Sequence, residues 1–328
     1  MTFADMPKVE LHLHHEAAAP PAFIRKLARE KNIDISAIFD ENGGYAFRDF
    51  DHFLKVYDGA CLPLQTPEDF RRLTYAALEE TAKYGVIYAE TFVSPDFCGG
   101  GDLSAWRDFL AAMQEGAHQA EADFGIVHRT IVTCLRHEGP EQAKTAAKCA
   151  VETMGDYMVG FGMAGAEMMG RPGDFAYSFD MAREAGLHLT CHAGEWGGPD
   201  MVAETIDDLK VSRIGHGINA VHDDQLIDRI IDQGIVLEVC PGSNVVLQAV
   251  TGWDAHPIDI LRKKGVKITV STDDPPFFHT TMNDEFAMLA KTFGWDKPVF
   301  DALNQTAIQA AFCDDVTRSA ILKRLETS

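Results

Sequence analysis

Eight short apolar segments, rich in β-branched residues, alternate along the chain with segments of helical periodicity. The apolar segments span residues 9–14, 86–94, 128–136, 158–165, 187–195, 212–217, 235–243 and 267–274. Most of them are continuously apolar, as expected for parallel strands that are covered on both faces. Because strand–helix alternation repeated eight times is typical of a closed parallel sheet, we predict a single (β/α)8 TIM-barrel domain over residues 1–328.

Helical periodicity marks the segments between these strands. The expected helices span residues 70–84, 142–153, 175–185, 201–209, 223–233 and 257–264. Two regions go beyond a minimal barrel. The long segment between the first two strands contains amphipathic stretches at 20–31 and 50–61, which we expect to form an inserted helical lid. Helical patterns at 283–293 and 300–312 predict extra C-terminal helices after the last strand.

The charge balance disfavours several classes of partner. Lys and Arg number 29 against 50 Asp and Glu, which gives a net charge of −21. Such a chain repels nucleic acid backbones and anionic membrane surfaces, so we expect neither of them and instead a small-molecule partner. The sequence shows no apolar run long enough to span a membrane and no leader pattern. The 7 cysteines form no CxxC pair, which favours free thiols and a cytoplasmic location.

Polar residues gather at the expected C-terminal ends of the strands, where the active site of a parallel barrel lies. These ends read HLH at 12–14, GAE at 165–167, HAGE at 192–195, GHG at 215–217 and STDD at 271–274. His12 and His14 are two residues apart, so a strand places both imidazoles on one face. Together with His192 and Asp273 they form a set of three histidines and one aspartate. This set predicts one Zn²⁺ per chain with room for a bound water.

Three further strand-end residues are candidates for acid–base chemistry and substrate binding. Glu195 follows His192 through Gly194, and a turn at this glycine returns the carboxyl to the barrel mouth. A carboxyl that faces an apolar ring has a raised pKa and serves as a general acid. His216 lies between two glycines, which let a ligand approach closely. We expect Asp274 to contact substrate while its neighbour in sequence binds the metal.

The strand ends resemble those of the adenosine deaminase family, zinc-dependent purine aminohydrolases within the wider amidohydrolase group. The segments that carry the resemblance are PKVELHLH at 7–14, MAGAE at 163–167, HAGE at 192–195, GHG at 215–217, EVCPGSN at 238–244 and STDDP at 271–275. Their order along the chain makes the set highly specific. The resemblance implies a TIM-barrel enzyme that removes an amino group from a purine.

The resemblance also implies a role for each strand-end residue. The zinc ligands are expected to be His12, His14, His192 and Asp273. Glu195 corresponds to the residue that protonates N1 of the purine, His216 to the base and orienter of the zinc-bound water, and Asp274 to the residue that contacts N7 and this water. The other expected substrate contacts are His14, the backbone N–H of Gly165 at N3, Glu16, and the apolar gate residues Phe50, Phe53 and Leu54.

Glu16 decides the expected substrate. The family places a carboxylate near the ribose 5′-hydroxyl at this position, where it accepts a hydrogen bond. Without the sugar, a buried carboxylate would be left unpaired at a cost of about 1–3 kcal/mol. We therefore expect hydrolysis of adenosine and 2′-deoxyadenosine, with inosine and ammonia as the products from adenosine. The lid over the sugar is expected to carry Phe50, Phe53, Leu54 and Tyr57.

Alternatives to adenosine stay open. His15 and Ala17 depart from the family pattern beside Glu16, as do Gly162 and Ala166 near the fourth strand end. The alternative substrates are adenine, an N6-substituted adenine or a modified adenosine. A catalytically silent purine-binding protein is a distant alternative, since each metal and acid–base position is filled. Lactam or ester hydrolysis is disfavoured because the fourth strand end has no lysine to bridge two metals.

Overall fold

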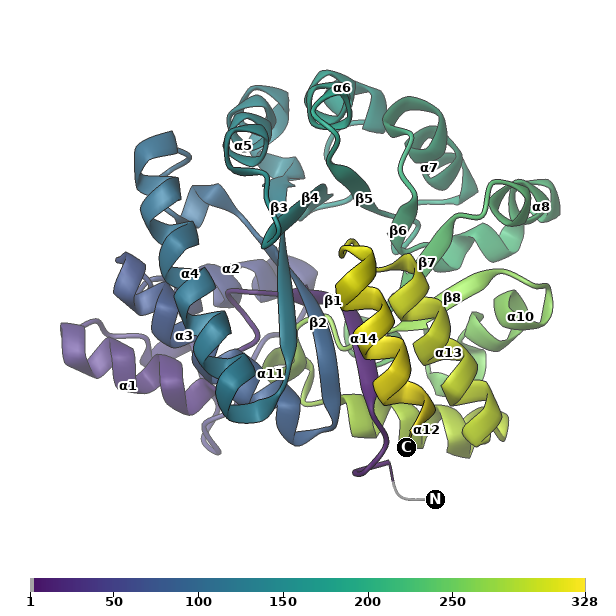
Figure 1. Ribbon diagram of the computed structural model, residues 1–328, viewed down its shortest axis with the longest axis horizontal. Coiled ribbons are helices and arrows are strands. Elements are labelled where there is room, and N and C mark those ends of the chain that lie inside the picture. The colour runs from purple at the N-terminus through teal and green to yellow at the C-terminus, as the bar shows by residue number, and fades with distance from the viewer. Residues whose placement is uncertain (1–2, 328) are drawn as a thin grey trace.

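Eight parallel strands form one sheet whose neighbours follow the order of the chain, from β1 to β8. The structure is a computed structural model that describes residues 3–327, so the outermost residues of the expected domain lie outside it. The strands are β1 (Lys8–His14), β2 (Val86–Val93), β3 (Val127–Leu135), β4 (Met158–Ala164), β5 (His188–Ala193), β6 (Arg213–His216), β7 (Val236–Val239) and β8 (Lys267–Val270). Helices surround them (Figure 1).

Backbone hydrogen bonds join the first strand to the segment that follows the last one. The His14 N–H donates to the Asp273 carbonyl at 3.0 Å, and the Asp273 N–H donates to the His12 carbonyl at 3.1 Å. These bonds bring the two edges of the sheet together at its C-terminal end. The predicted (β/α)8 TIM barrel is thereby confirmed.

The helices fall into three groups. The first group connects the strands of the barrel. It consists of α3 (Pro67–Lys83), which precedes β2, and of the helices between β2 and β8, which are α4 (Leu103–Phe124), α5 (Gly139–Thr153), α6 (Ala176–Glu184), α7 (Pro199–Glu204), α8 (Asp224–Asp232), α9 (Pro241–Val246) and α10 (Ile258–Lys263). The lid region holds α1 (Pro21–Lys31) and α2 (Phe50–Cys61), and the C-terminal part holds α11 (Pro275–Phe278), α12 (Met282–Phe293), α13 (Lys297–Ala310) and α14 (Asp315–Glu326). Within residues 3–327, no helix is both long and apolar enough to cross a membrane.

The limits of several elements differ from the prediction. The strand expected at 235–243 is too long, because Pro241 has a fixed φ and no N–H and instead begins α9. The strands expected at 187–195, 212–217 and 267–274 also end early, at Ala193, His216 and Val270. The polar residues after these ends leave the ladder and turn into the barrel mouth.

Four helices were absent from the prediction: the short α9 and α11 and the longer α4 and α14. The buried face of α4 contains alanines and Gly116, and such small residues weaken the apolar periodicity that identifies a helix. Gly116 lets α4 approach α3 closely, since a Cβ there would lie 2.4 Å from the carbonyl oxygen of Arg71. In α14 the described side chains include only one buried residue, Ile321, so the apolar stripe is too narrow to indicate a packed helix.

A buried cation holds two buried carboxylates inside the barrel. The Arg213 guanidinium, on β6, forms ion pairs of 2.7 Å with Glu90 on β2 and 2.5 Å with Glu238 on β7. It also lies 3.5 Å from the ring centroid of Phe312. All three charged side chains are at most 1% exposed. Removing one partner from such a group leaves buried charge uncompensated, which costs several kcal/mol.

Replacing Arg213 therefore tests how far the barrel depends on this group. We expect Arg213→Met to lower the free energy of unfolding by about 3–5 kcal/mol, since Glu90 and Glu238 lose their shared cation. The matched control is Arg171→Met, which removes a half-exposed pair with Glu204 and should cost at most about 1 kcal/mol. Denaturant unfolding measures both variants. Equal losses in the two would contradict a special role for Arg213.

Candidate active site

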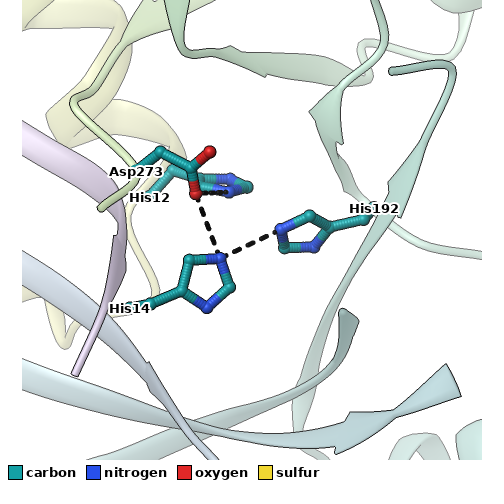
Figure 2. A group of neighbouring side chains, drawn as sticks. All are labelled: His12, His14, His192 and Asp273. Atoms are coloured by element: carbon teal, nitrogen blue, oxygen red, sulfur yellow. Dashed lines mark hydrogen bonds and ion pairs between the residues drawn. The ribbon is translucent and has the colours of Figure 1, made fainter. Parts of the chain in front are cut away.

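Four side chains from three parts of the barrel converge at its C-terminal end (Figure 2). His12 and His14 come from β1, His192 from β5, and Asp273 from the segment after β8. His14 Nε2 lies 3.3 Å from His192 Nε2 and 3.1 Å from Asp273 Oδ1. One donor atom from each of the four lies within 4.8 Å of the others, a spacing that suits a single metal ion.

Hydrogen bonds behind the cluster direct imidazole lone pairs into it. His192 Nδ1 lies 3.0 Å from the Met163 carbonyl, which only accepts, so this nitrogen carries the proton and Nε2 is free. His12 Nδ1 lies 2.9 Å from the Glu238 carboxylate, which fixes the same tautomer. Within the part of the chain that the structure describes, His12 Nε2 is buried and has no hydrogen-bond partner. Imidazole nitrogens that point at one another and at a carboxylate fit a divalent metal ion, which would replace any proton on them.

The carboxylate of Asp273 is held in place from its other side. Its Oδ2 accepts a hydrogen bond of 2.6 Å from Ser243 Oγ. Asp273 has a φ of +68°, a left-handed conformation that is uncommon for a non-glycine residue. Sequence reasoning assigned no role to Ser243 or Glu238, although both lie in the segment 238–244. A charged residue inside the apolar strand β7 was the available signal for Glu238.

A pocket opens beside the cluster and includes the expected substrate residues. Its volume is about 770 Å³, including its opening to solvent. Helix α2 covers it with apolar side chains and one phenol ring, Phe50, Phe53, Leu54 and Tyr57. The other expected residues that line it are His14, Glu16, Gly165, His192, Glu195, His216, Asp273 and Asp274. Of the expected site residues only His12 does not line the pocket, and it is fully buried.

Two carboxyl groups in the pocket have an unused oxygen. Glu195 Oε1 and Asp274 Oδ1 are buried and have no hydrogen-bond partner among residues 3–327. Burial raises the pKa of Glu195 well above its usual value, and the carboxylates of Asp273 and Glu167 raise it further. Burial raises the pKa of Asp274 to about 8. Both groups are therefore suited to hydrogen-bond a ligand, and a neutral Glu195 can donate a proton.

A hydrogen-bonded chain sets the tautomer of His216. The Ile258 N–H, which only donates, binds His256 Nδ1 at 3.1 Å, so His256 carries its proton on Nε2. That nitrogen lies 3.2 Å from Asn244 Oδ1, and Asn244 Nδ2 lies 3.1 Å from His216 Nδ1. Burial lowers the pKa of His216 to about 3, so the ring is neutral. Its proton is therefore on Nε2, which lies 3.7 Å from the Glu195 carboxylate.

Glu16 is already paired within the protein. Its Oε1 accepts from the Ser94 N–H at 3.0 Å, and its Oε2 accepts from the Tyr57 hydroxyl at 3.1 Å. The neighbouring His15 departs from the family pattern but does not line the pocket. It is buried between the hydroxyls of Thr91 and Thr74, at 2.9 and 2.8 Å.

Relatives of nearly equal length are similar to this chain. A protein named adenine deaminase from Chelativorans sp. (strain BNC1) is 46% identical over 321 residues, which cover 97% of this chain and 98% of that protein. A protein of the same name from Rhizobium rhizogenes is 44% identical over 321 residues, which cover 98% of this chain and 99% of that protein.

Solved structures show the same architecture. An adenine deaminase from Arthrobacter aurescens is 30% identical, with a TM-score of 0.89 and 98% of each chain covered. An amidohydrolase from Burkholderia ambifaria, solved with bound Zn, is 26% identical, with a TM-score of 0.86 and coverage of 99% of this chain and 94% of that one. The N6-methyl-AMP deaminase from Arabidopsis thaliana is 25% identical, with a TM-score of 0.86 and coverage of 99% and 98%.

The prediction of adenosine as the preferred substrate is wrong. The relatives 46% and 44% identical to this chain are named for adenine, which agrees with the alternative substrate and not with adenosine. The prediction assumed that Glu16 would be unpaired without a ribose hydroxyl. The structure removes this premise, because Ser94 and Tyr57 already occupy both oxygens of its carboxylate.

The resemblance seen in the strand ends extends over nearly the whole chain. The family model described as adenosine deaminase matches residues 7–328. Its members are metal-dependent hydrolases of the amidohydrolase type that act on a purine ring. This protein therefore belongs to the adenosine deaminase family.

Proposed function

We propose that this protein is an adenine deaminase, which hydrolyses adenine to hypoxanthine and ammonia. The observation that carries the proposal is the pairing of Glu16 with Ser94 and with Tyr57 of the lid helix. Each oxygen of this carboxylate already accepts a hydrogen bond from the protein. Binding of a free base, which has no ribose hydroxyl, therefore leaves no oxygen of Glu16 without a partner. The names of relatives that match almost the entire chain support the same substrate.

We infer that His12, His14, His192 and Asp273 hold one zinc ion. Three imidazole nitrogens and one carboxylate oxygen form a donor set that zinc accepts, with a coordination position left for a non-protein ligand. The related amidohydrolase with bound Zn supports the choice of metal. When bound, zinc supplies Lewis acidity that makes water a stronger nucleophile near neutral pH.

The pocket residues account for the remaining chemistry. The neutral Glu195 carboxyl donates its proton to ring nitrogen N1, which makes the adjacent carbon C6 more electrophilic. Water adds to C6 and the bond from C6 to the amino nitrogen breaks. The proton from Glu195 stays on N1, one proton of the water leaves with the amino group as ammonia, and the other restores the Glu195 carboxyl. His216 presents an N–H to the incoming oxygen. Of the two roles that the resemblance implies for His216, its hydrogen bonds favour the orienting one.

Other residues hold the purine and exclude water. Phe50, Phe53 and Leu54 cover the pocket with apolar surface, which excludes bulk water from the reaction. The uncommitted oxygen of Asp274 is available to the N7 edge of the ring. Gly165 offers its N–H at the N3 edge. Only glycine fits this position, because its φ is +93° and a Cβ would lie 2.6 Å from His137 Nδ1.

The substrate preference is the first test. We expect kcat/KM for adenine to exceed that for adenosine by at least about 100-fold in the zinc-loaded protein, because Glu16 already has a donor on each oxygen and gains little from a ribose hydroxyl. A coupled spectrophotometric assay with both substrates measures the ratio. Comparable values of kcat/KM, or a higher value for adenosine, would refute the proposed function.

Tyr57→Phe provides a matched variant for this preference. Loss of the hydroxyl frees Glu16 Oε2 and keeps the aromatic ring of the lid. We expect the ratio of adenine to adenosine kcat/KM to narrow by about tenfold, the value of roughly one hydrogen bond. An unchanged ratio would show that the pairing of Glu16 does not set the preference.

The role of Glu195 predicts both a mutant effect and a pH dependence. Glu195→Gln should lower kcat by about 10²–10⁴-fold while zinc content stays at one per chain, because an amide has no acidic proton to give. Burial raises the Glu195 pKa, so the active protonated form predominates at lower pH and is lost as the pH rises through that pKa. Activity should therefore fall as the pH rises above the Glu195 pKa. The exposed Glu184→Gln serves as the control, and near-normal kcat in Glu195→Gln would remove Glu195 from the mechanism.

Metal dependence is tested through the residue behind His12. Chelation should abolish activity, and added zinc should restore it. Glu238→Gln should weaken zinc binding by about 10–100-fold, since the charged partner that fixes the His12 tautomer is lost. Competition with a zinc-binding dye measures the affinity. Wild-type affinity in this variant, or binding of two zinc ions per active chain, would contradict the proposed site.

A further inference from the structure

The turn that carries Glu195 is held by a second, buried glutamate. Glu167 follows β4 and is 2% exposed. Its Oε1 accepts a hydrogen bond of 2.5 Å from the Gly194 N–H, and its Oε2 accepts bonds of 3.1 Å from the Glu195 N–H and 2.8 Å from the Trp196 N–H. One carboxylate thus takes three consecutive N–H groups of the turn after β5.

This arrangement fixes the backbone of the turn. Successive N–H groups that point to one anion form a concave binding site for negative charge, and hydrogen bonds to a carboxylate are stronger than neutral ones. Gly194 adopts a φ of +76°, and a Cβ there would lie 2.4 Å from Val202 Cγ2. A Cβ on Gly197 would lie 2.7 Å from Glu167 Oε1. The glycines are therefore required for the turn to wrap around the carboxylate.

Asn219 holds the same turn from its carbonyl side. This residue lies in the 3-10 helix η6 (Ile218–His222), which follows β6. Its Nδ2 donates to the carbonyls of Glu195 at 3.2 Å and Gly197 at 3.0 Å, and its backbone N–H donates to the Gly194 carbonyl at 2.9 Å. Glu167 thus binds backbone N–H groups of residues 194–197, and Asn219 binds backbone carbonyls of the same segment.

The Glu195 side chain depends on this backbone for its position. In the described part of the chain, its Oε1 has no hydrogen-bond partner. Its Oε2 lies 3.7 Å from His216 Nε2, beyond hydrogen-bond distance. No strong side-chain contact therefore aims the carboxyl group. Because Glu167 occupies the three N–H groups, they are also unavailable to stabilise a charged Glu195, which agrees with the raised Glu195 pKa.

We propose that Glu167 and Asn219 are positioning residues that aim the Glu195 carboxyl at the substrate through the backbone of residues 194–197. The inference rests on the proposed role of Glu195 as the proton donor. It gives a function to the strand-end glutamate in the segment 165–167, which has no place in the metal cluster and does not line the pocket.

Glu167→Gln tests the proposal in the zinc-loaded protein. The amide keeps the size of the side chain but has a single acceptor oxygen, and its NH2 group faces an N–H donor of the turn. We expect kcat for adenine to fall by about 10–100-fold, as for a small misplacement of a reacting group, while KM changes less than about threefold. Zinc content should stay at one per chain. The alkaline limb of the pH profile should move to lower pH, because freed N–H groups favour charged Glu195.

Asp69→Asn is the matched control. Asp69 is another buried carboxylate that accepts two backbone N–H groups, from Gln65 at 3.0 Å and Thr66 at 2.8 Å, but it lies at the start of α3, outside the pocket. Its loss should reduce stability without altering kcat or the pH profile. If Glu167→Gln, like Asp69→Asn, reduces stability but changes neither kcat nor the pH profile, Glu167 is merely structural and the proposal is overturned.

Asn219→Ala decides the proposal if Glu167→Gln does not fold. We expect the same signature, a lower kcat with retained zinc and nearly constant KM, and an unchanged kcat would overturn the proposal. A wild-type protein that does not deaminate adenine would refute the proposed function and not this inference. Crystal structures of the zinc-loaded variants then decide: a displaced Glu195 side chain supports the positioning role, and an unmoved one refutes it.

Discussion

The carboxylate of Glu238 connects the charged interior of the barrel to its metal-binding cluster. One oxygen pairs with Arg213 at 2.5 Å and accepts from Thr190 at 3.1 Å, and the other binds His12 Nδ1 at 2.9 Å. Burial alone would raise the Glu238 pKa, but Arg213 and His12 outweigh it and hold the pKa below its usual value. Glu238 therefore stays charged, and its bond to Nδ1 of His12 turns Nε2 toward the cluster. The stability of the interior and the geometry of the site depend on the same ion pair.

The backbone hydrogen bonds that close the barrel also place the residues of the site. The bonds that join β1 to the segment after β8 run between the residues expected to hold the metal. Asp273 and His216 both adopt a left-handed φ, of +68° and +61°, although neither is glycine. Such backbone strain persists only where the surrounding structure imposes it, and it commonly gathers at active sites. Here it turns polar side chains out of two strand ends and into the pocket.

The sequence was sufficient for the barrel and for the residues of the cluster. Continuous apolar segments locate strands covered on both faces, and the C-terminal ends of parallel strands meet at one rim, so His12, His192 and Asp273 had to lie close together. What a residue touches across the fold could not be predicted. Glu16 is paired by Tyr57, which lies 41 positions away on an inserted helix, and this contact removes the premise on which adenosine was predicted. The hydrogen bonds between Glu167 and the turn after β5 could not be predicted either, because they depend on which strand ends lie side by side in the fold.

The proposed preference for a free base rests on a Glu16 carboxylate that has hydrogen-bond partners before any substrate enters. A crystal structure of the zinc-loaded protein with hypoxanthine bound tests this account most directly. We expect one zinc between His12, His14, His192 and Asp273, the ring N1 edge at Glu195, and Glu16 still bonded to Tyr57 and Ser94. A Glu16 side chain that has left these partners to bind the ligand, or a zinc ion held by other residues, would contradict it.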